Sequence, residues 1–402
     1  MKKAVMYGAG NIGRGFIGAL MSQSGYRVTF VDVAEPVVES LQTKGVYPVR
    51  YVSGEVHEDV WIENVTAVNG NDMDAVAEII ATCDIMATAV GARILPYIVP
   101  NIVAGLRKRW AQTNAPLNII ICENLMDANK VLESMLKAEL TPAEQVKFDE
   151  TVGLVEASIG RMVPVQTDRM KDGEPLRVCV EPYGFLPVDK AAFRGDLPDI
   201  PAMVPYAPFD FYLKRKLYVH NMGHAVCAYL GDLLGLEYIW QAIGVPEIRL
   251  IVHNAMLDSA VALSQKYDAS LSDLQKHIAD LLGRFTNQAL GDTCQRVGGD
   301  PARKLSPADR LVGAAKLAYE QGITPCYLAV GAAAGVKRYI AESEDSALTA
   351  EAVLETVCQL SLSDPLAGMI LAFYNQICSG STPMQLLQKA DAEKQKTLQN
   401  VI

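Results

Sequence analysis

The stretch KAVMYGAGNIGRGFIG, residues 3–18, decides the fold, because a short apolar run leads through closely spaced glycines into a second apolar segment. The run KAVMY is typical of a buried strand, and the segment from Asn11 to Gly25 is typical of a helix that a glycine ends. A strand that turns through glycines into a helix begins many parallel α/β sheets. We therefore predict a strand, a tight turn and a helix at the start of the chain.

The same alternation continues through the first half of the chain. YRVTFVD is a second predicted strand, and AEPVVESLQTKG is a second helix, which ends at Gly45. DIMATAV, LNIIICEN and TVGLVEASIG are further predicted strands, with the helix LPYIVPNIVAGLRKRWAQ between the first two of these. Strands that alternate with helices indicate the α/β class with a parallel sheet.

Two segments interrupt this alternation. The interval YPVRYVSGEVHEDVWIENVTAVNG, residues 47–70, predicts an antiparallel insert or an edge hairpin, and PLRVCVEPYG, residues 175–184, predicts a further strand in a small hairpin near the domain edge. Strand patterns end at about residue 195, in the passage GDLPDIPAMVPYAPFD, and helical spacing follows. We therefore predict a sheet domain over residues 1–194 and a mostly α-helical domain over residues 195–402.

The composition limits the classes of partner. The 402 residues are 50% hydrophobic and 20% charged, as expected for a soluble protein, and the net charge of -10 argues against nucleic acid, whose phosphates attract basic surfaces. The eight cysteines have no metal-ligand spacing and predict reduced, buried thiols. No signal-peptide core precedes Gly8, and no apolar run reaches the roughly 20 residues of a membrane span. We expect a cytoplasmic monomer or small homo-oligomer without membrane partners.

GAGNIG matches the pattern GxGxxG at Gly8, Gly10 and Gly13. The first glycine permits the tight turn, the second lets the backbone approach a pyrophosphate, and the third lets the helix pack on the strand. The start of the helix offers free amide groups to the anion. This turn predicts a dinucleotide-binding Rossmann domain; a glycine-rich turn without a ligand is the alternative.

Asp32 ends the second strand about 20 residues beyond the glycines, where a carboxylate can accept hydrogen bonds from both hydroxyls of an adenosine ribose. Val33 and Ala34 follow it and provide no arginine for a 2′-phosphate. This favours NAD over NADP. A flavin in the same fold is a further alternative, although no second flavin-type motif is present.

The stretch KLYVHNMGH, residues 216–224, places Lys216, Asn221 and His224 in an otherwise apolar run. In a helix of about 100° per residue, Asn221 lies about 140° and His224 about 80° around the axis from Lys216, so all three can face one cavity. A desolvated lysine can act as the base in alcohol oxidation, because its pKa falls toward neutrality. Asn221 can donate to the developing alkoxide, and His224 can orient a hydroxyl. Taken singly, Lys216 could be a surface lysine and His224 a core histidine.

His220 and His224 are four residues apart, which zinc ligands also can be, but no glutamate follows His220 and no acidic third ligand is evident nearby. We therefore expect no metal. Asn124 ends the strand LNIIICEN, at the edge where open α/β sheets bind ligands, and is a candidate catalytic residue. It is also a candidate N-cap of the following helix, and both roles can coexist.

Several motifs together resemble the polyol-specific long-chain dehydrogenases of the mannitol dehydrogenase family. They are GAGNIGRGFIG, TAVG, LNIIICEN, KLYVHNMGHAVCAYLG with its K-x4-N-x2-H frame, LGRF and DPARKLSPADRL. The resemblance extends from residue 1 to about residue 340 and is specific as a combination. It implies a Rossmann domain, a helical domain with the active site between the two, and metal-free, NAD-linked interconversion of mannitol 1-phosphate and fructose 6-phosphate.

The resemblance also implies residue roles. Lys216 matches the general base, and Asn124, Asn221 and His224 match polar partners of the reacting oxygen. Cofactor contacts are implied for the glycine turn and for two residues at strand ends, namely Gly8, Gly10, Asn11, Ile12, Gly13, Asp32 and Val90.

The basic segment PARKLSPADR offers Arg303 and Lys304 to a substrate phosphate, because a bidentate arginine with a nearby lysine suits a phosphate monoester. The alternative is a solvated loop in which these charges pair with Asp300 and Asp309. The family resemblance favours the substrate role.

Two positions depart from the family pattern and leave the substrate open. Gly160 stands in IGRMVP where the family commonly has an aspartate, and Gly299 stands in RVGGDPARKL where it more often has an arginine. An unphosphorylated polyol or a hexuronate is therefore an alternative to the sugar alcohol phosphate. A nucleotide-binding regulatory protein that has lost catalysis is the alternative of another class.

Overall fold

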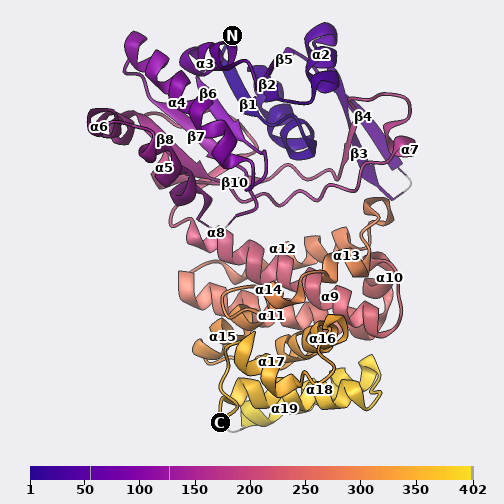
Figure 1. The fold of residues 1–402 in the computed structure, drawn as a ribbon. Coiled ribbons are helices and arrows are strands. Elements are labelled where there is room, and N and C mark those ends of the chain that lie inside the picture. The colour runs from indigo at the N-terminus through magenta and orange to yellow at the C-terminus, as the bar shows by residue number, and fades with distance from the viewer. Residues whose placement is uncertain (55, 126, 400–402) are drawn as a thin grey trace. The chain divides into compact units, whose positions relative to one another are not determined.

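The computed structural model describes residues 1–54, 56–125 and 127–399. The chain divides into two units, Met1–Asp210 and Phe211–Ile402 (Figure 1). A parallel sheet in the first unit and helices in the second confirm the predicted fold class. The last three residues of the predicted helical domain lie outside the described residues.

The first unit is built on a six-stranded parallel sheet in the order β5-β2-β1-β6-β7-β8. Its strands are β1 (Lys3–Tyr7), β2 (Arg27–Asp32), β5 (Val65–Asn69), β6 (Ile85–Thr88), β7 (Leu117–Ile121) and β8 (Val152–Glu156). The strand order reverses between β1 and β6, and ligands of open α/β sheets bind outside the carboxyl ends of the strands at such a point. The glycine turn after β1 and the loop after β6 therefore lie where a ligand is expected.

Helices cover both faces of this sheet (Figure 1). The helical segments of the first unit are the π-helical η1 (Gly13–Gly18), the 3-10 helix η2 (Lys190–Ala192), and the α-helices α1 (Ala19–Gln23), α2 (Glu35–Lys44), α3 (Met73–Thr82), α4 (Leu95–Gln112), α5 (Ala128–Ala138), α6 (Pro142–Thr151) and α7 (Asp168–Lys171), of which α7 lies beside the small sheet described next. Phe16 of η1 packs in the core on one face, and Ile80 of α3 packs in the core on the other. Gly25 and Gly45 adopt left-handed φ angles just beyond α1 and α2, which confirms the predicted helix stops.

A small sheet joins the insert to a later segment. β3 (Tyr47–Ser53) and β4 (Val56–Ile62) form the predicted antiparallel hairpin, and β9 (Val178–Val180) pairs with β3 in parallel. The strand predicted within residues 175–184 is therefore confirmed, but its predicted place in a small hairpin is wrong. β9 packs on η1 instead, where a Cβ on Gly15 would lie 2.8 Å from Val178 and Val180, and no local pattern encodes that contact.

The last strands of the first unit lie in the proline-rich passage. β10 (Leu186–Asp189) and β11 (Met203–Tyr206) form a parallel two-stranded sheet. β11 lies beyond residue 195, where we expected strands to end. That expectation is wrong because a strand paired on one side only tolerates proline, and Pro205 is part of β11.

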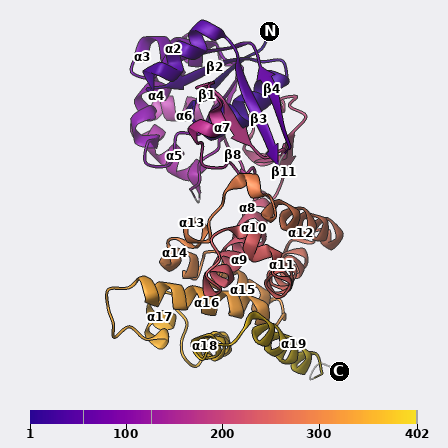
Figure 2. The ribbon, with the colours of Figure 1, turned by 90° about the vertical axis from the view of Figure 1, so that its right-hand side faces the viewer.

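The described part of the second unit is helical (Figure 2). One continuous helix comprises α8 (Asp210–Arg215), the π-helical η3 (Lys216–Asn221) and α9 (Met222–Leu233). The remaining helices are α10 (Ile239–Gly244), α11 (Pro246–Tyr267), α12 (Leu271–Phe285), the 3-10 helix η4 (Gln288–Leu290), α13 (Cys294–Gly298), α14 (Pro301–Leu305), α15 (Val312–Glu320), α16 (Cys326–Glu342), α17 (Ala350–Thr356), α18 (Pro365–Cys378) and α19 (Pro383–Gln399).

The core of the second unit surrounds α9 and α16, most of whose residues are buried. Gly331 allows these two helices to approach closely, because a Cβ there would lie 2.4 Å from Val226. Seven cysteines of the chain are buried, as predicted, whereas Cys378 is exposed at the end of α18. No helix in the described ranges is both long and apolar enough to cross a membrane.

Candidate functional site

The glycine turn has the geometry that its motif predicts. Gly8 adopts a φ angle of 101°, and a Cβ there would lie 2.5 Å from the Ala89 carbonyl oxygen. A Cβ on Gly13 would lie 1.9 Å from the Gly8 oxygen, so helix and strand pack too closely for a side chain. A Cβ on Gly10 would meet nothing within 4 Å. The backbone at Gly10 is therefore open to a pyrophosphate.

Asp32 lies at the end of β2, next to this turn. Its Oδ2 accepts a hydrogen bond of 2.7 Å from the Ala9 amide, and its Oδ1 accepts one of 3.0 Å from the Ala34 amide. Each carboxylate oxygen has a further lone pair. The backbone thus orients Asp32 and leaves it able to accept hydrogen bonds from two ribose hydroxyls, so these residues fit a dinucleotide.

The loop after β6 is fixed by Glu123, which sequence reasoning missed. The Glu123 carboxylate is buried and accepts hydrogen bonds from the amides of Val90, at 3.0 Å, and Gly91, at 2.7 Å. This holds Val90 beside the glycine turn, where its Cγ1 would lie 3.2 Å from a Cβ on Gly8. The signal was its position at the end of LNIIICEN. Of the other residues predicted to contact the cofactor, Asn11 is exposed and Ile12 packs against the core.

Arg14 is a second residue that sequence reasoning missed. It lies in η1 directly after the turn and is buried, and its Nε and Nη1 have no hydrogen-bond partner among the described residues. Burial lowers the pKa of its guanidinium, and the neighbouring Tyr47 and Asp32 oppose that shift. A buried cation without full compensation is costly. Its presence here suits a site that receives an anion.

Asn124 follows β7 at the carboxyl edge of the sheet and is exposed. It does not cap the next helix, because α5 begins at Ala128 and Asp127 occupies the N-cap position. The N-cap prediction for Asn124 is therefore wrong. The cap is Asp127, three residues later than the sequence indicated.

The two departures from the family pattern differ in their surroundings. A Cβ on Gly160 would lie 3.1 Å from Cε1 and 3.2 Å from the hydroxyl of Tyr183, so Tyr183 occupies the space that a side chain there requires. Gly299 follows α13, and a Cβ there would lie 3.3 Å from the Arg296 oxygen. A side chain at either position would require its neighbours to shift.

Lys216, Asn221 and His224 lie on the continuous helix α8-η3-α9, which confirms the predicted helix but not its predicted geometry. In a π-helical turn, backbone hydrogen bonds join residues i and i+5. Lys216 and Asn221 are therefore neighbours along the helix, instead of about 140° apart as in a regular α-helix. His224 follows Asn221 by three residues, on the same face of α9. All three side chains are half-buried.

His224 stacks on Phe285, with ring centroids 4.8 Å apart and planes inclined by 14°. Its Nε2 lies 3.4 Å from Oδ2 of Asp292, a buried residue that sequence reasoning missed. Burial lowers the pKa of His224 to about 3, and the nearby Arg296 and Arg310 add to this shift. His224 is therefore neutral near pH 7, and a neutral imidazole can donate one hydrogen bond and accept another.

His220 is buried, and its ring centroid lies 6.2 Å from that of His224. Burial lowers its pKa well below the usual value. Within the described residues, no group of three or more His, Cys, Asp or Glu side chains is arranged to hold a metal ion.

Arg303 and Lys304 on α14 have different surroundings. Arg303 is half exposed and pairs with Asp300 at 2.6 Å and with Asp309 at 3.4 Å. For Arg303, this agrees with the alternative prediction, in which the basic residues pair with these two carboxylates. Lys304 is only 5% exposed and forms no ion pair with any described residue. Burial lowers its pKa to about 8, and Arg310 and Arg303 add to the shift. Of the two, Lys304 is thus the cation that lacks an anionic partner among the described residues.

The basic cluster of Arg303, Lys304 and Arg310 lies close to His224, because the charges of Lys304 and Arg310 lower the pKa of that histidine. Two carboxylates, Asp300 and Asp309, pair with this cluster, so the five side chains together carry a net charge of +1. In a chain of net charge -10, this local excess favours an anionic ligand.

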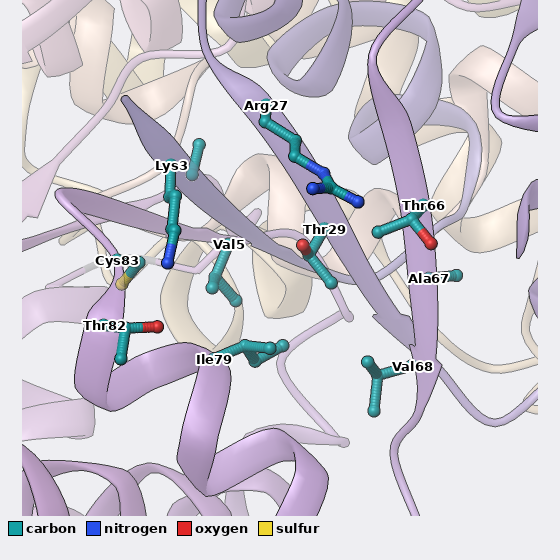
Figure 3. Close-up of a pocket in the computed structure, with 11 residues that line it drawn as sticks. Lys3, Val5, Arg27, Thr29, Thr66, Ala67, Val68, Ile79, Thr82 and Cys83 are labelled. Atoms are coloured by element: carbon teal, nitrogen blue, oxygen red, sulfur yellow. The ribbon is translucent and has the colours of Figure 1, made fainter. Parts of the chain in front are cut away.

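A cavity in the first unit lies away from these residues (Figure 3). It begins at Lys3 and Arg27, the first residues of β1 and β2, and Ile79 of α3 lines its other side. None of the predicted site residues lines it. Because ligands of parallel sheets bind at the carboxyl ends of the strands, this cavity is not the predicted cofactor site.

Two family models together match most of the chain. Residues 2–202 match the mannitol dehydrogenase Rossmann domain, and residues 209–369 match the mannitol dehydrogenase C-terminal domain. This chain belongs to the mannitol dehydrogenase family. The match continues past residue 340, where the resemblance in the motifs faded.

Curated members of the mannitol dehydrogenase family are similar over most of their length. Mannitol-1-phosphate 5-dehydrogenase of Bacillus subtilis is 37% identical over 383 residues, which are 93% of this chain and 100% of that protein. The protein of the same name from Brevibacillus brevis is 38% identical over 344 residues, which are 86% and 88% of the two chains.

Solved structures confirm the fold of the mannitol dehydrogenase family for this chain. Substrate-free D-sorbitol dehydrogenase matches with a TM-score of 0.79 at 15% identity, over 96% of this chain and 94% of that one. The Pseudomonas fluorescens mannitol 2-dehydrogenase complex with NAD and D-mannitol matches with a TM-score of 0.71 at 15% identity, over the same shares.

Proposed function

We propose that this protein is an NAD-dependent polyol-phosphate dehydrogenase that interconverts mannitol 1-phosphate and fructose 6-phosphate. The names of its relatives and the fit of the glycine turn and Asp32 to a dinucleotide support the proposal. The observation that carries it is Lys304, a residue that is only 5% exposed and forms no ion pair with any described residue. A phosphate monoester would supply the negatively charged partner that this lysine lacks.

We assign proton transfer to Lys216. NAD, when bound, would supply the hydride acceptor for the carbon that carries the reacting hydroxyl. Lys216 takes the proton of that hydroxyl, and Asn221, its neighbour in the π-helical turn, donates a hydrogen bond to the oxygen as negative charge develops. His224 and Asn124 orient hydroxyls of the substrate. Because an amine and an amide perform these steps, we propose that the reaction requires no metal ion.

Lys304 binds the substrate phosphate in this proposal, with Arg310 beside it. Arg310 is held by Asp309, whose Oδ1 accepts hydrogen bonds from both the Arg310 amide and its Nε. Arg303 contributes indirectly, because it shares Asp309 and so limits the negative charge near Lys304.

NADH oxidation at neutral pH tests the proposal, with fructose 6-phosphate and fructose compared side by side, each with and without a chelator. We expect activity with fructose 6-phosphate that the chelator leaves unchanged, and little with fructose. Loss of activity on chelation, reversed by a divalent metal, would reject the lysine mechanism.

A dehydrogenase of an unphosphorylated polyol or a hexuronate is the second candidate. The observation that favours it is Gly160, where Tyr183 fills the space that an aspartate would require. Turnover of fructose or fructuronate in preference to fructose 6-phosphate would select this candidate. NAD binding without turnover of any of these compounds would instead favour the regulatory protein.

A further inference from the structure

Asp292 is a fixed carboxylate beside His224. Its Oδ2 faces His224 Nε2 at 3.4 Å, and its Oδ1 is paired with Arg296 of α13. The backbone is held as well, because the Asp292 carbonyl accepts a hydrogen bond of 2.9 Å from the Ile239 amide. The carboxylate is therefore presented to the histidine in one orientation.

His224 is held equally well on its other side. Its ring stacks on Phe285 at the end of α12, so it cannot rotate freely. Nε2 is buried and has no hydrogen-bond partner among the described residues. The 3.4 Å contact with Asp292 is longer than a good hydrogen bond, but catalytic contacts often tighten when substrate binds. Asp292 is the acceptor within reach of this nitrogen.

A neutral imidazole has one N–H and one lone pair, and an ionised carboxylate can only accept hydrogen bonds. We propose that Asp292 is a positioning residue that holds His224 as the Nε2–H tautomer and leaves Nδ1 as an acceptor for a substrate hydroxyl. This inference rests on the proposed function and deepens it. An alkoxide or a carbonyl oxygen has no proton to donate to Nδ1. His224 therefore orients a hydroxyl that keeps its proton, while Asn221 donates to the reacting oxygen.

The substitution Asp292→Asn removes the negative charge of the carboxylate and keeps the size and shape of the side chain. Arg296 can only donate hydrogen bonds, so it selects the amide oxygen of the new side chain as its partner. The amide NH₂ then faces His224 Nε2, which must become an acceptor and pass its proton to Nδ1. The substrate hydroxyl then meets a donor where the unmodified protein offers an acceptor, so it must turn its own proton to another partner or leave it unpaired. We expect kcat/KM for the sugar to fall about 10²-fold, a typical cost of one misdirected hydrogen bond in an active site.

The tautomer is measured directly by ¹⁵N NMR of the whole protein labelled at histidine, without substrate or NAD, and His224→Gln assigns the signals. We expect the Nε2–H form in the unmodified protein, the Nδ1–H form in Asp292→Asn, and the Nε2–H form in the control Arg296→Gln, which keeps the carboxylate. An Nδ1–H tautomer of His224 in the unmodified protein would overturn the inference even if Asp292→Asn and Arg296→Gln failed to fold. The same tautomer in Asp292→Asn as in the unmodified protein would also overturn it.

Kinetics separate this inference from the proposed function. If Asp292→Asn changes the tautomer but neither Asp292→Asn nor His224→Gln changes turnover, the positioning contact stands and the proposed role of His224 fails. If the tautomer stays the same while turnover falls, Asp292 acts in some other way and the inference fails. NADH affinity should remain within about twofold in each variant, because Asp292 and Arg296 belong to the second unit.

Discussion

The glycine turn of the first unit and the Lys216 helix of the second show two ways to build a site. The turn uses residues adjacent in sequence, from Gly8 to Gly13, and the close approach of Gly13 to the Gly8 oxygen lies within the motif, although Gly8 also packs against Ala89. The helical site combines Lys216 with partners from distant segments, such as Phe285 and Asp292. A motif therefore suffices to find the first kind of site, whereas only some residues of the second kind can be found in this way.

The comparison is sharpest between Arg303 and Lys304, which are adjacent on α14. One is half exposed and paired with carboxylates, and the other is buried without an ion pair to any described residue. Charge alone does not distinguish them in sequence. Burial decides for which of them the lack of an anionic partner matters, because an unpaired charge is costly in free energy only where water is excluded.

The largest effect is expected from Lys216→Ala. The base acts only in the chemical step, so we expect kcat to fall about 10²- to 10⁴-fold while NADH affinity stays unchanged. Steady-state kinetics with fructose 6-phosphate and NADH fluorescence titration measure the two quantities. Lys214→Ala is the matched control and should retain most of the activity. Near-normal turnover of Lys216→Ala would remove this lysine from the mechanism. The glycine turn would then be the one site of the comparison that still stands.

Lys304→Met should act on the substrate and on stability in opposite directions. Loss of a charged hydrogen bond raises KM for fructose 6-phosphate by roughly 10- to 100-fold. Removal of a buried cation with a lowered pKa should at the same time raise the thermal unfolding midpoint. Arg303→Gln, the adjacent control, should raise KM less and lower the midpoint. Equal KM changes in the two variants would refute the distinction between them.

Asp32→Ala tests the locally encoded site. The loss of the carboxylate should raise KM for NADH about tenfold or more and leave kcat nearly unchanged. Asp84→Ala is the control, because Asp84 also accepts a backbone hydrogen bond, from the Lys3 amide, but at the opposite end of the sheet. An unchanged KM for NADH in Asp32→Ala would refute the ribose contact.

The smallest effect is expected from pH. The pKa of Lys304 is lowered to about 8, so its charge is present below that pH and is lost as the pH rises through it. A phosphate monoester is already mostly dianionic at neutral pH, since its second pKa is about 6. KM for fructose 6-phosphate should therefore rise severalfold, and by less than about tenfold, from pH 7 to pH 9. Lys304→Arg should remove this rise, because a guanidinium remains charged. A rise that persists in Lys304→Arg would assign it to another group.

Much of the first unit could be predicted because its signals are local. Gly25 and Gly45 end helices where the pattern indicated, and Asp32 ends β2 beside the glycine turn. β9 was mistaken for half of a hairpin because its partner is β3, a strand far earlier in the chain. Asn124 was a candidate N-cap, but α5 begins at Ala128, after Asp127.

The sequence by itself determined the α/β fold class, the glycine turn and the helix that carries Lys216, Asn221 and His224. These features depend on periodicity and on backbone contacts between near neighbours, which any stretch of chain carries with it. Only the tertiary structure decided that a π-helical turn makes Lys216 and Asn221 neighbours, that Lys304 is buried, and that Asp292 faces His224. Burial and long-range contacts exist only after the chain has packed, because both depend on segments that the sequence separates.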